Sequence, residues 1–265
     1  MVRVRTRQAA AYSKKRYSRS FVSLRSGAAR PSLLRMVRLV LFDIDGTLIR
    51  TSGAGIRAFA KVFETVFGAV DGFERLKFSG RTDYGIVREF FGAHQIEPSP
   101  ENFNRFFEPY IFWLDHILSQ SRCDICVGVT DFIQGLKELP EPPVLGLLTG
   151  NIRLGAEIKL RHLGLWETFA TGAFADDHEQ RDQIAAIARE RGGRLLGRAL
   201  RGDEVLVIGD TPLDIRCARA IDARVIAVAT GGATLAELQE HSPDWAVGTL
   251  NEVSPGEAVS QPGLS

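Results

Sequence analysis

The stretch Leu39-Val40-Leu41-Phe42-Asp43-Ile44-Asp45-Gly46-Thr47-Leu48 decides how the rest of this 265-residue chain is interpreted. Its first four residues are apolar strand formers and predict a buried parallel strand that ends on two carboxylates. In open α/β sheets the carboxyl ends of the strands border the ligand crevice, and two acids one residue apart there repel each other. A divalent cation would relieve that repulsion. An ordinary strand followed by an acidic Asp-Gly turn is the simpler alternative.

Length and composition favour a globular α/β protein. A chain of 265 residues with 45% hydrophobic content suits one large domain or a core with a smaller insert. No apolar run approaches the roughly 18 residues needed to span a bilayer, so we expect no membrane-embedded protein. Three cysteines form no disulfide framework and favour a reducing, cytoplasmic location; the lone pair Cys123 and Cys126 is weak evidence for a metal or redox site.

The charge is distributed unevenly along the chain. Residues 1–35 hold ten of the 33 Lys and Arg residues and no acid, which leaves 23 basic against 32 acidic residues, a net charge of −9, from Met36 onward. The globular part is therefore not expected to bind nucleic acid. We expect the basic leader to be disordered, and three accounts of it stay open: an organelle-targeting presequence, a basic arm for anionic partners, or a start assigned upstream of Met36.

A second strand end carries a hydroxyl group. Residues 144–148 are apolar, follow two prolines and lead into Thr149-Gly150-Asn151. A threonine hydroxyl with neighbouring backbone N–H groups can hold a phosphate oxygen. A Thr-Gly turn is common in itself, so its weight comes from its place in the chain.

A basic residue follows the next predicted strand. Arg181 opens a helix after a short strand near residues 168–174, and it can grip a carboxylate or phosphate at two points. Lys159, in the preceding helix, is the rival for the same role. We favour Arg181 because of its place at a helix start; a solvated surface cation is the alternative for either.

A further strand, residues 204–208, ends in Gly209-Asp210-Thr211-Pro212-Leu213-Asp214. Glycine permits a sharp turn and Pro212 suits the first helical position, so Asp214 is expected about one turn beyond Asp210. With Asp43 and Asp45, this would bring four carboxylates to one edge of the sheet, which requires a cation.

The segment from residue 51 to residue 126 has helical periodicity with many phenylalanines, which predicts an inserted helical block with Pro109 bending its last helix. Between its first two helices lies the polar loop 78–83. We expect this loop to reach into the crevice and Arg81 to contact an anionic part of a substrate.

Together these motifs resemble the haloacid dehalogenase-like phosphohydrolase superfamily, in its phosphoglycolate phosphatase-like and β-phosphoglucomutase-like subgroup. The D-I-D-G-T sequence, the strand end at Thr149, the basic residue and the Gly-Asp turn occur in the family's order. The family usually has Lys where this chain has Arg181. The resemblance implies a Rossmann-like, doubly wound parallel α/β core (residues 36–50 and 127–250), a helical C1 cap of four or five helices (51–126), and a loose tail (251–265).

The resemblance also implies a Mg²⁺-dependent phosphatase acting through an aspartyl-phosphate. Asp43 would be the nucleophile and Asp45 the general acid and base. Asp43, the carbonyl of Asp45, Asp210 and Asp214 would hold the metal. The phosphate would lie against four residues: Thr149, Gly150, Asn151 and Arg181.

Two alternatives stay open: a sugar-phosphate mutase of β-phosphoglucomutase type, and a non-catalytic phosphate- or partner-binding module. An acid at position 45 favours phosphomonoester chemistry, because dehalogenases of the family lack it. We expect a small phosphorylated metabolite as substrate, phosphoglycolate being one candidate, with no nucleic acid or membrane partner. A cytoplasmic monomer or homodimer is expected, or organelle import if the leader is genuine.

Overall fold

The computed structural model describes residues 36–69, 71 and 76–260. The expectations made for the basic leader and for residues 261–265 lie outside the described residues.

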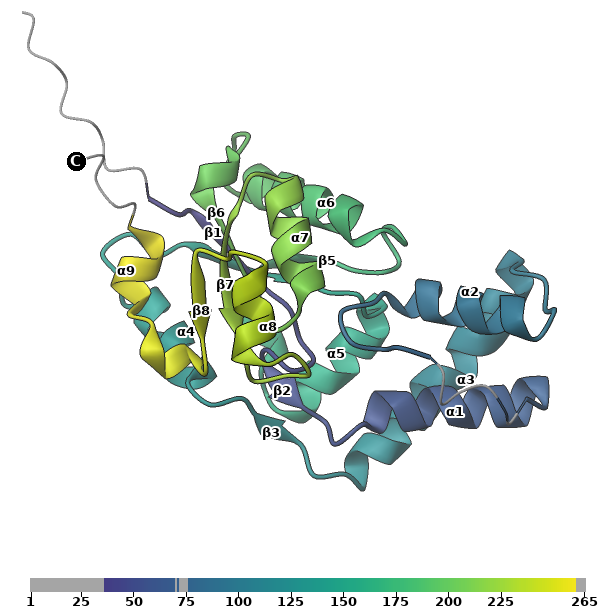
Figure 1. The fold of residues 1–265 in the computed structure, drawn as a ribbon. Helices are drawn as coiled ribbons and strands as arrows, with labels where there is room; N and C mark the ends of the chain where they lie inside the picture. The colour runs from purple at the N-terminus through teal and green to yellow at the C-terminus, as the bar shows by residue number, and fades with distance from the viewer. Residues whose placement is uncertain (1–35, 70, 72–75, 261–265) are drawn as a thin grey trace, which may run out of the picture. The chain divides into compact units, whose positions relative to one another are not determined.

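A six-stranded parallel sheet forms the core, in the order β5-β4-β1-β6-β7-β8 (Figure 1). Its strands are β1 (Leu39–Phe42), β4 (Val144–Leu148), β5 (Thr171–Ala173), β6 (Val205–Gly209), β7 (Arg224–Val228) and β8 (Trp245–Val247). Strand β1 lies between β4 and β6, with Phe42 opposite Leu147 and Ile208. The expected α/β fold with a parallel sheet is confirmed.

Helices cover both faces of this sheet because alternate strand residues point to opposite sides. Val40 and Phe42 pack in one cluster with α4 (Val129–Lys137), α5 (Arg153–His162) and α9 (Pro255–Val259). Leu39 and Leu41 pack in another, with α6 (Arg181–Leu195), α7 (Pro212–Ala220) and α8 (Leu235–Glu240). Both faces of β1 are thus buried, and its carboxyl end is left as the place where polar groups can gather.

Among its described residues the inserted block contains α1 (Ala54–Phe67), α2 (Asp83–Ala93) and α3 (Pro100–Ser119). The four or five helices that the resemblance implies stay a prediction. Helices α1, α2 and α3 pack around phenylalanines; Phe63 stacks on Phe90 with ring centroids 3.5 Å apart. Pro109 lies inside α3, and the bend predicted there stays a prediction.

Two short strands join this block to the core. Strand β2 (Ile49–Arg50) pairs antiparallel with β3 (Asp124–Ile125), so the chain enters and leaves the block side by side. Ser52 (φ 48°) and Gly53 (φ 74°) then turn the chain into α1, and the Ser52 hydroxyl donates a 2.7 Å hydrogen bond to the carbonyl of Arg122. The two connections are therefore tied to each other as well as to the core.

The expectation of a loose tail from residue 251 is wrong for residues 251–260. A 3₁₀ turn (Leu250–Glu252) and α9 follow β8, and Val253, Ala258 and Val259 are buried in the core cluster of α4 and α5. The backbone N–H of Val37 also donates to the carbonyl of Val259. The segment is short and has few apolar residues, so its burial depends on tertiary contacts that no local periodicity records.

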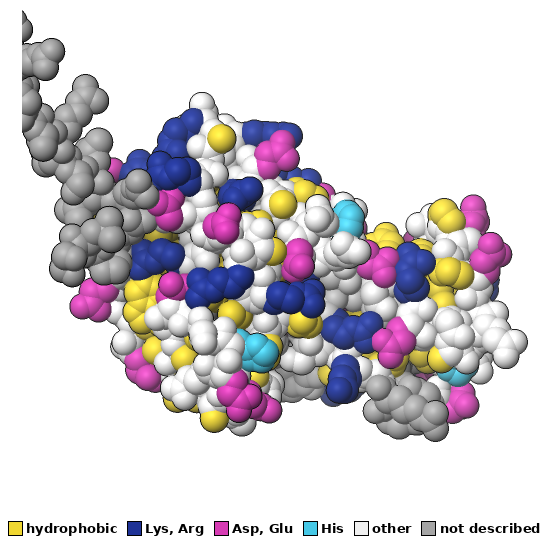
Figure 2. All heavy atoms as spheres, turned by 45° about the horizontal axis from the view of Figure 1, so that its top comes forward, with side chains coloured by type: hydrophobic (Ala, Val, Ile, Leu, Met, Phe, Trp, Pro, Cys, Tyr) yellow, Lys and Arg dark blue, Asp and Glu magenta, His cyan; other side chains and the backbone are white. Residues whose placement is uncertain are grey.

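The surface in Figure 2 has basic and acidic side chains interspersed over the face in view. None of the helices in residues 36–69, 71 and 76–260 is long and apolar enough to cross a membrane.

Candidate active site

The loop after β1 carries Asp43 and Asp45 and is held in shape by a glycine turn and two hydrogen bonds. Gly46 takes a left-handed conformation (φ 87°), which favours glycine. Its carbonyl accepts a 2.6 Å hydrogen bond from the hydroxyl of Thr230, and the Thr47 hydroxyl donates to Oδ1 of Asp210 over 3.2 Å. The loop is therefore fixed to the ends of β6 and β7.

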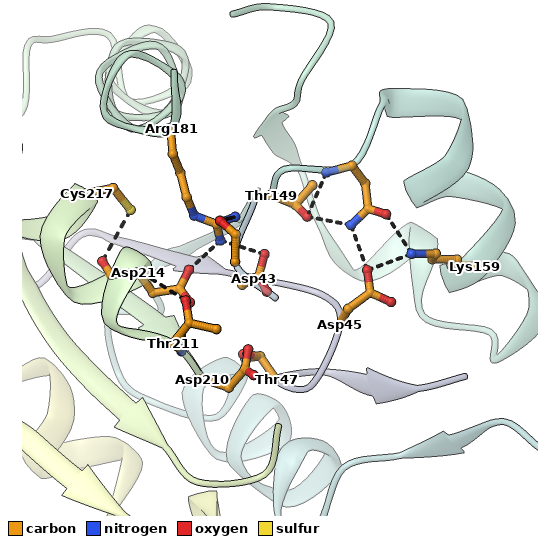
Figure 3. Close-up of polar contacts among 12 residues, drawn as sticks. Asp43, Asp45, Thr47, Thr149, Lys159, Arg181, Asp210, Thr211, Asp214 and Cys217 are labelled. Atoms are coloured by element: carbon orange, nitrogen blue, oxygen red, sulfur yellow. Dashed lines mark hydrogen bonds and ion pairs between the residues drawn. The ribbon is translucent and has the colours of Figure 1, made fainter. Parts of the chain in front are cut away.

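Asp43 and Asp214 share one guanidinium group (Figure 3). Nη2 of Arg181, the first residue of α6, donates to Oδ1 of Asp43 over 2.8 Å and to Oδ1 of Asp214. All three side chains are buried. Burial raises the pKa of Asp43 to about 6, although the Arg181 charge acts in the opposite direction. Arg181 therefore holds one oxygen of Asp43 and leaves its Oδ2 without a hydrogen bond from the described residues.

The start of α7 fixes Asp214. Thr211 and Asp214 form a capping box: the N–H and hydroxyl of Thr211 donate to Oδ2 of Asp214 over 3.0 and 2.6 Å. Pro212 occupies the first helical turn, as predicted. Both oxygens of Asp214 are thus engaged, which suits a residue that holds the site in place.

Asp210 lies in a narrow backbone cradle. A β-carbon added to Gly231 would come 1.6 Å from its Oδ2, and one added to Gly46 would come 2.5 Å from the same atom. Burial, together with the charges of Asp214 and Asp43, raises the pKa of Asp210 to about 8. The missing side chain of Gly231 therefore makes room for this carboxylate.

The donor set fits a divalent cation. Carboxylate oxygens of Asp43, Asp210 and Asp214 lie within 4.8 Å of one another. Four carboxylates, including Asp45, face two cations, Arg181 and Lys159, so full ionisation leaves a net charge of −2. Hard oxygen ligands of this kind suit Mg²⁺ or a similar ion, which would neutralise the remaining charge.

A second group of contacts surrounds Asp45 (Figure 3). Its Oδ2 accepts hydrogen bonds from Nζ of Lys159 over 2.6 Å and from Nδ2 of Asn151 over 2.8 Å. Nδ2 of Asn151 also donates to the hydroxyl oxygen of Thr149 over 2.8 Å, and Nζ of Lys159 donates to Oδ1 of Asn151 over 2.6 Å. The strand end after β4 is therefore joined to Asp45 through an amide and an ammonium group.

Lys159 and Arg181, which the sequence presented as rivals, both reach the site. Arg181 contacts Asp43 and Asp214, whereas Lys159 contacts Asp45. The two residues lie on helices that cover opposite faces of the sheet, α5 and α6, so both can reach the same strand ends. The sequence alone could not show that each has its own partner.

The loop of the helical block reaches the core closely, as expected. A β-carbon on Gly150 would come 2.2 Å from the carbonyl oxygen of Arg81, and the N–H of Asp83 donates to the carbonyl of Gly150 over 2.7 Å. The Asp83 carboxyl accepts a 2.8 Å hydrogen bond from the N–H of Ile152. Burial raises the pKa of Asp83 to about 7, although the charge of Lys159 lowers it.

Asp83 was not predicted as a site residue. The signal that could have identified it is its position directly after Thr82, which caps α2 by accepting a hydrogen bond from the N–H of Gly85. A helix that begins at the crevice with an acidic first residue places that residue against the core.

The interface of the two parts encloses a cavity of about 480 Å³. The core side presents Asp43, Asp45, Thr149, Lys159, Arg181 and Asp210. The helical block contributes apolar side chains, among them Ile56, Phe59 and Ile86, together with polar ones such as Ser79 and Asp83. Arg81 also lines the cavity, but its guanidinium bonds Glu89 and the carbonyl of Gly85. Its predicted contact with a substrate stays a prediction.

The fold and the strand-end residues agree with a comparison against known families. The model of the haloacid dehalogenase-like hydrolase family matches residues 40–228, and the chain belongs to this family. The match covers all four strand-end motifs from Asp43 to Asp214.

Individual relatives are more distant. A Clostridium perfringens protein, named provisionally as the pyrophosphatase PpaX, is 25% identical over 217 residues, which cover 80% of this chain and 93% of that protein. A predicted phosphatase from Clostridium acetobutylicum superposes with a TM-score of 0.63 at 18% identity, over 82% of this chain and 96% of that one. CbbY from Rhodobacter sphaeroides, solved with phosphate, gives a TM-score of 0.60 at 20% identity, over 75% and 88%.

Proposed function

We propose that this protein is a Mg²⁺-dependent phosphatase that hydrolyses a small phosphate monoester through an aspartyl-phosphate on Asp43. The observation that carries the proposal is the environment of Asp43: a buried carboxylate at the cavity floor, with one oxygen held by Arg181 and the other free of hydrogen bonds from the described residues. An oriented carboxylate with a free oxygen can act as a nucleophile.

The neighbouring side chains supply the remaining functions. Oδ2 of Asp43 attacks phosphorus while the bond to the leaving oxygen breaks, and Asp45 gives that oxygen a proton. Asp45 then removes a proton from the water that releases phosphate from Asp43. The hydroxyl of Thr149 and the guanidinium of Arg181 bind the phosphoryl oxygens, on which charge is spread in the transition state.

Mg²⁺, held by Asp43, Asp210 and the carbonyl of Asp45, would neutralise charge on the phosphoryl group. Asp214 would keep Arg181 and the α7 start in position, since both of its oxygens are already engaged.

The cavity favours a small substrate. A volume of about 480 Å³ holds a compact metabolite, and the side chains of the helical block that line the cavity would face its leaving group. The phosphate complex of CbbY and the pyrophosphatase name of the C. perfringens relative suggest which phosphate compounds to include in a first panel.

The test is release of phosphate by the full chain from phosphorylated metabolites, including phosphoglycolate, sugar phosphates and pyrophosphate, with Mg²⁺ or with EDTA. We expect Mg²⁺-dependent release that disappears in Asp43→Asn and persists in Asp131→Asn, an exposed aspartate on α4. Release that survives Asp43→Asn would exclude the aspartyl-phosphate mechanism. Transfer of phosphate within a sugar phosphate, without release, would favour a mutase.

A further inference from the structure

Lys159 is a buried cation for which the phosphatase mechanism above has no role. Its side chain is 5% exposed, although lysine is rarely buried without a specific partner. Nζ contacts Oδ2 of Asp45 and Oδ1 of Asn151, both at 2.6 Å. These contacts bear directly on the orientation of the carboxyl group of Asp45, the predicted general acid.

The two oxygens of Asp45 have different surroundings. Oδ2 accepts hydrogen bonds from the ammonium of Lys159 and from the amide of Asn151, whereas no hydrogen bond from the described residues reaches Oδ1. An oxygen that already accepts two donors is poorly placed to carry a proton, because that proton would point at the donors. A proton on Asp45 therefore belongs on Oδ1.

The position of Lys159 is fixed from two sides. On the core side, Lys159 donates to Asn151, and the amide of Asn151 donates a hydrogen bond to the hydroxyl oxygen of Thr149. Lys159 is thereby linked to the end of β4. From the helical block, α1 covers the ammonium: a β-carbon added to Gly55 would come 3.4 Å from Nζ. Lys159 thus lies enclosed between the core and the block, with little freedom to leave Asp45.

We propose that Lys159 is a positioning residue that holds Oδ2 of Asp45, so that Oδ1 is the atom that delivers the proton to the leaving oxygen. The proposal rests on the phosphatase function above. As the bond from Oδ2 of Asp43 to phosphorus forms, the bond from phosphorus to the leaving oxygen breaks, and the proton moves from Oδ1 of Asp45 to that oxygen.

The role can be separated from simple phosphate binding by the choice of leaving group. An alkoxide is a strong base that needs a proton to leave, whereas p-nitrophenolate is stable and leaves without one. The ratio kcat/KM reports the steps up to departure of the leaving group and does not include the later attack of water. A residue that orients the acid should therefore affect alkyl phosphates selectively.

The experiment compares kcat/KM for an alkyl phosphate and for p-nitrophenyl phosphate in the full chain with Mg²⁺. We expect Lys159→Met to lower the alkyl value by about 10- to 100-fold and the aryl value by less than about 3-fold, since general acid catalysis contributes about 10²- to 10⁴-fold. Asp45→Asn should show the same selectivity, and adding Lys159→Met to it should cause little further loss. Arg161→Met, an exposed site on the same helix, should leave both values unchanged.

An equal loss with both substrates would overturn the proposal and assign Lys159 to phosphate binding, and so would independent losses in the double variant. If Lys159→Met does not fold, Lys159→Arg, which keeps the charge but moves the donor, must show the alkyl-selective loss. If the unmodified protein releases phosphate from neither ester, the phosphatase function itself is wrong; activity without leaving-group selectivity contradicts the role of Lys159 alone.

Discussion

Gly231→Ala offers the sharpest structural test of the site, because it adds a single methyl group beside Asp210. The new β-carbon would lie 1.6 Å from Oδ2 of Asp210, which is 1.4 Å short of the 3.0 Å that real β-carbons keep. Asp210 has no room to retreat, since it is 2% exposed and a β-carbon on Gly46 would already come 2.5 Å from the same oxygen. Either the carboxylate or the loop that carries Gly231 must therefore move by more than 1 Å.

A displacement of this size is expensive for catalysis. Misplacing a catalytic group by about 1 Å can cost on the order of 10²-fold in rate. We expect Gly231→Ala to lower kcat/KM by about that factor and to raise the Mg²⁺ concentration needed for half-maximal activity. The neighbouring Gly232→Ala is the matched control, because its β-carbon would meet the flexible hydroxyl of Ser79 at 3.3 Å and leave its N–H free to donate to Asp210.

The assay is phosphate release over a Mg²⁺ titration, with thermal unfolding of each variant to establish that it folds. If Gly231→Ala keeps both the activity and the Mg²⁺ response of the parent, the cradle does not position Asp210 and the reasoning fails. The same conclusion follows if Gly232→Ala is impaired as severely, because the loss would then come from the turn and not from the contact with the carboxylate.

Two further predictions concern charge. Burial raises the pKa of Asp210 from its ordinary value of 3.8 to about 8 and that of Asp43 to about 6, so the folded protein binds more protons than the unfolded chain within that range. The free energy of unfolding of the metal-free protein should fall, by on the order of a few kcal/mol, as pH rises from about 4 to about 8. Denaturant titrations with EDTA at several pH values should show this fall in the free energy of unfolding, and the fall should be smaller in Asp210→Asn. Mg²⁺ should stabilise the parent protein more at pH 8 than at pH 5. An equal pH dependence in the parent and in Asp210→Asn would contradict the raised pKa of Asp210. Separately, Arg81→Ala should raise KM for an anionic substrate, because Arg81 lines the cavity; an unchanged KM would contradict the predicted contact with substrate.

The strand ends could be predicted from sequence because each combines a buried apolar run with a polar turn. Asp43, Thr149 and Asp210 all come from such junctions, and the parallel sheet brings them to one edge. Residues that reach the site from within a helix, away from a strand end, carry no comparable signal. Lys159 is such a residue: its partners Asp45 and Asn151 are 114 and 8 positions away, and only tertiary packing makes them neighbours.

The sequence also could not predict the glycine cradle around Asp210 or the contacts between the helical block and the core. Gly231 could be recognised as a turn residue, but its closeness to Asp210 depends on how β6 and β7 pair. The sequence can place Asp83 at a helix start after Thr82, but it does not give the partner Ile152, because that contact crosses from the helical block to the core. In both cases the decisive distance belongs to segments that are far apart in the chain.

The antiparallel pair of β2 and β3 has one more consequence. From the side of the core, these two strands are the arms of a β-hairpin, and the whole helical block is its loop. Domain insertions are tolerated best where the chain leaves and returns at adjacent points, because the host then keeps its own contacts. The block can therefore be treated as a replaceable cassette: a different helical insert on the same two arms would change what covers the leaving group and leave the phosphoryl chemistry of the core in place.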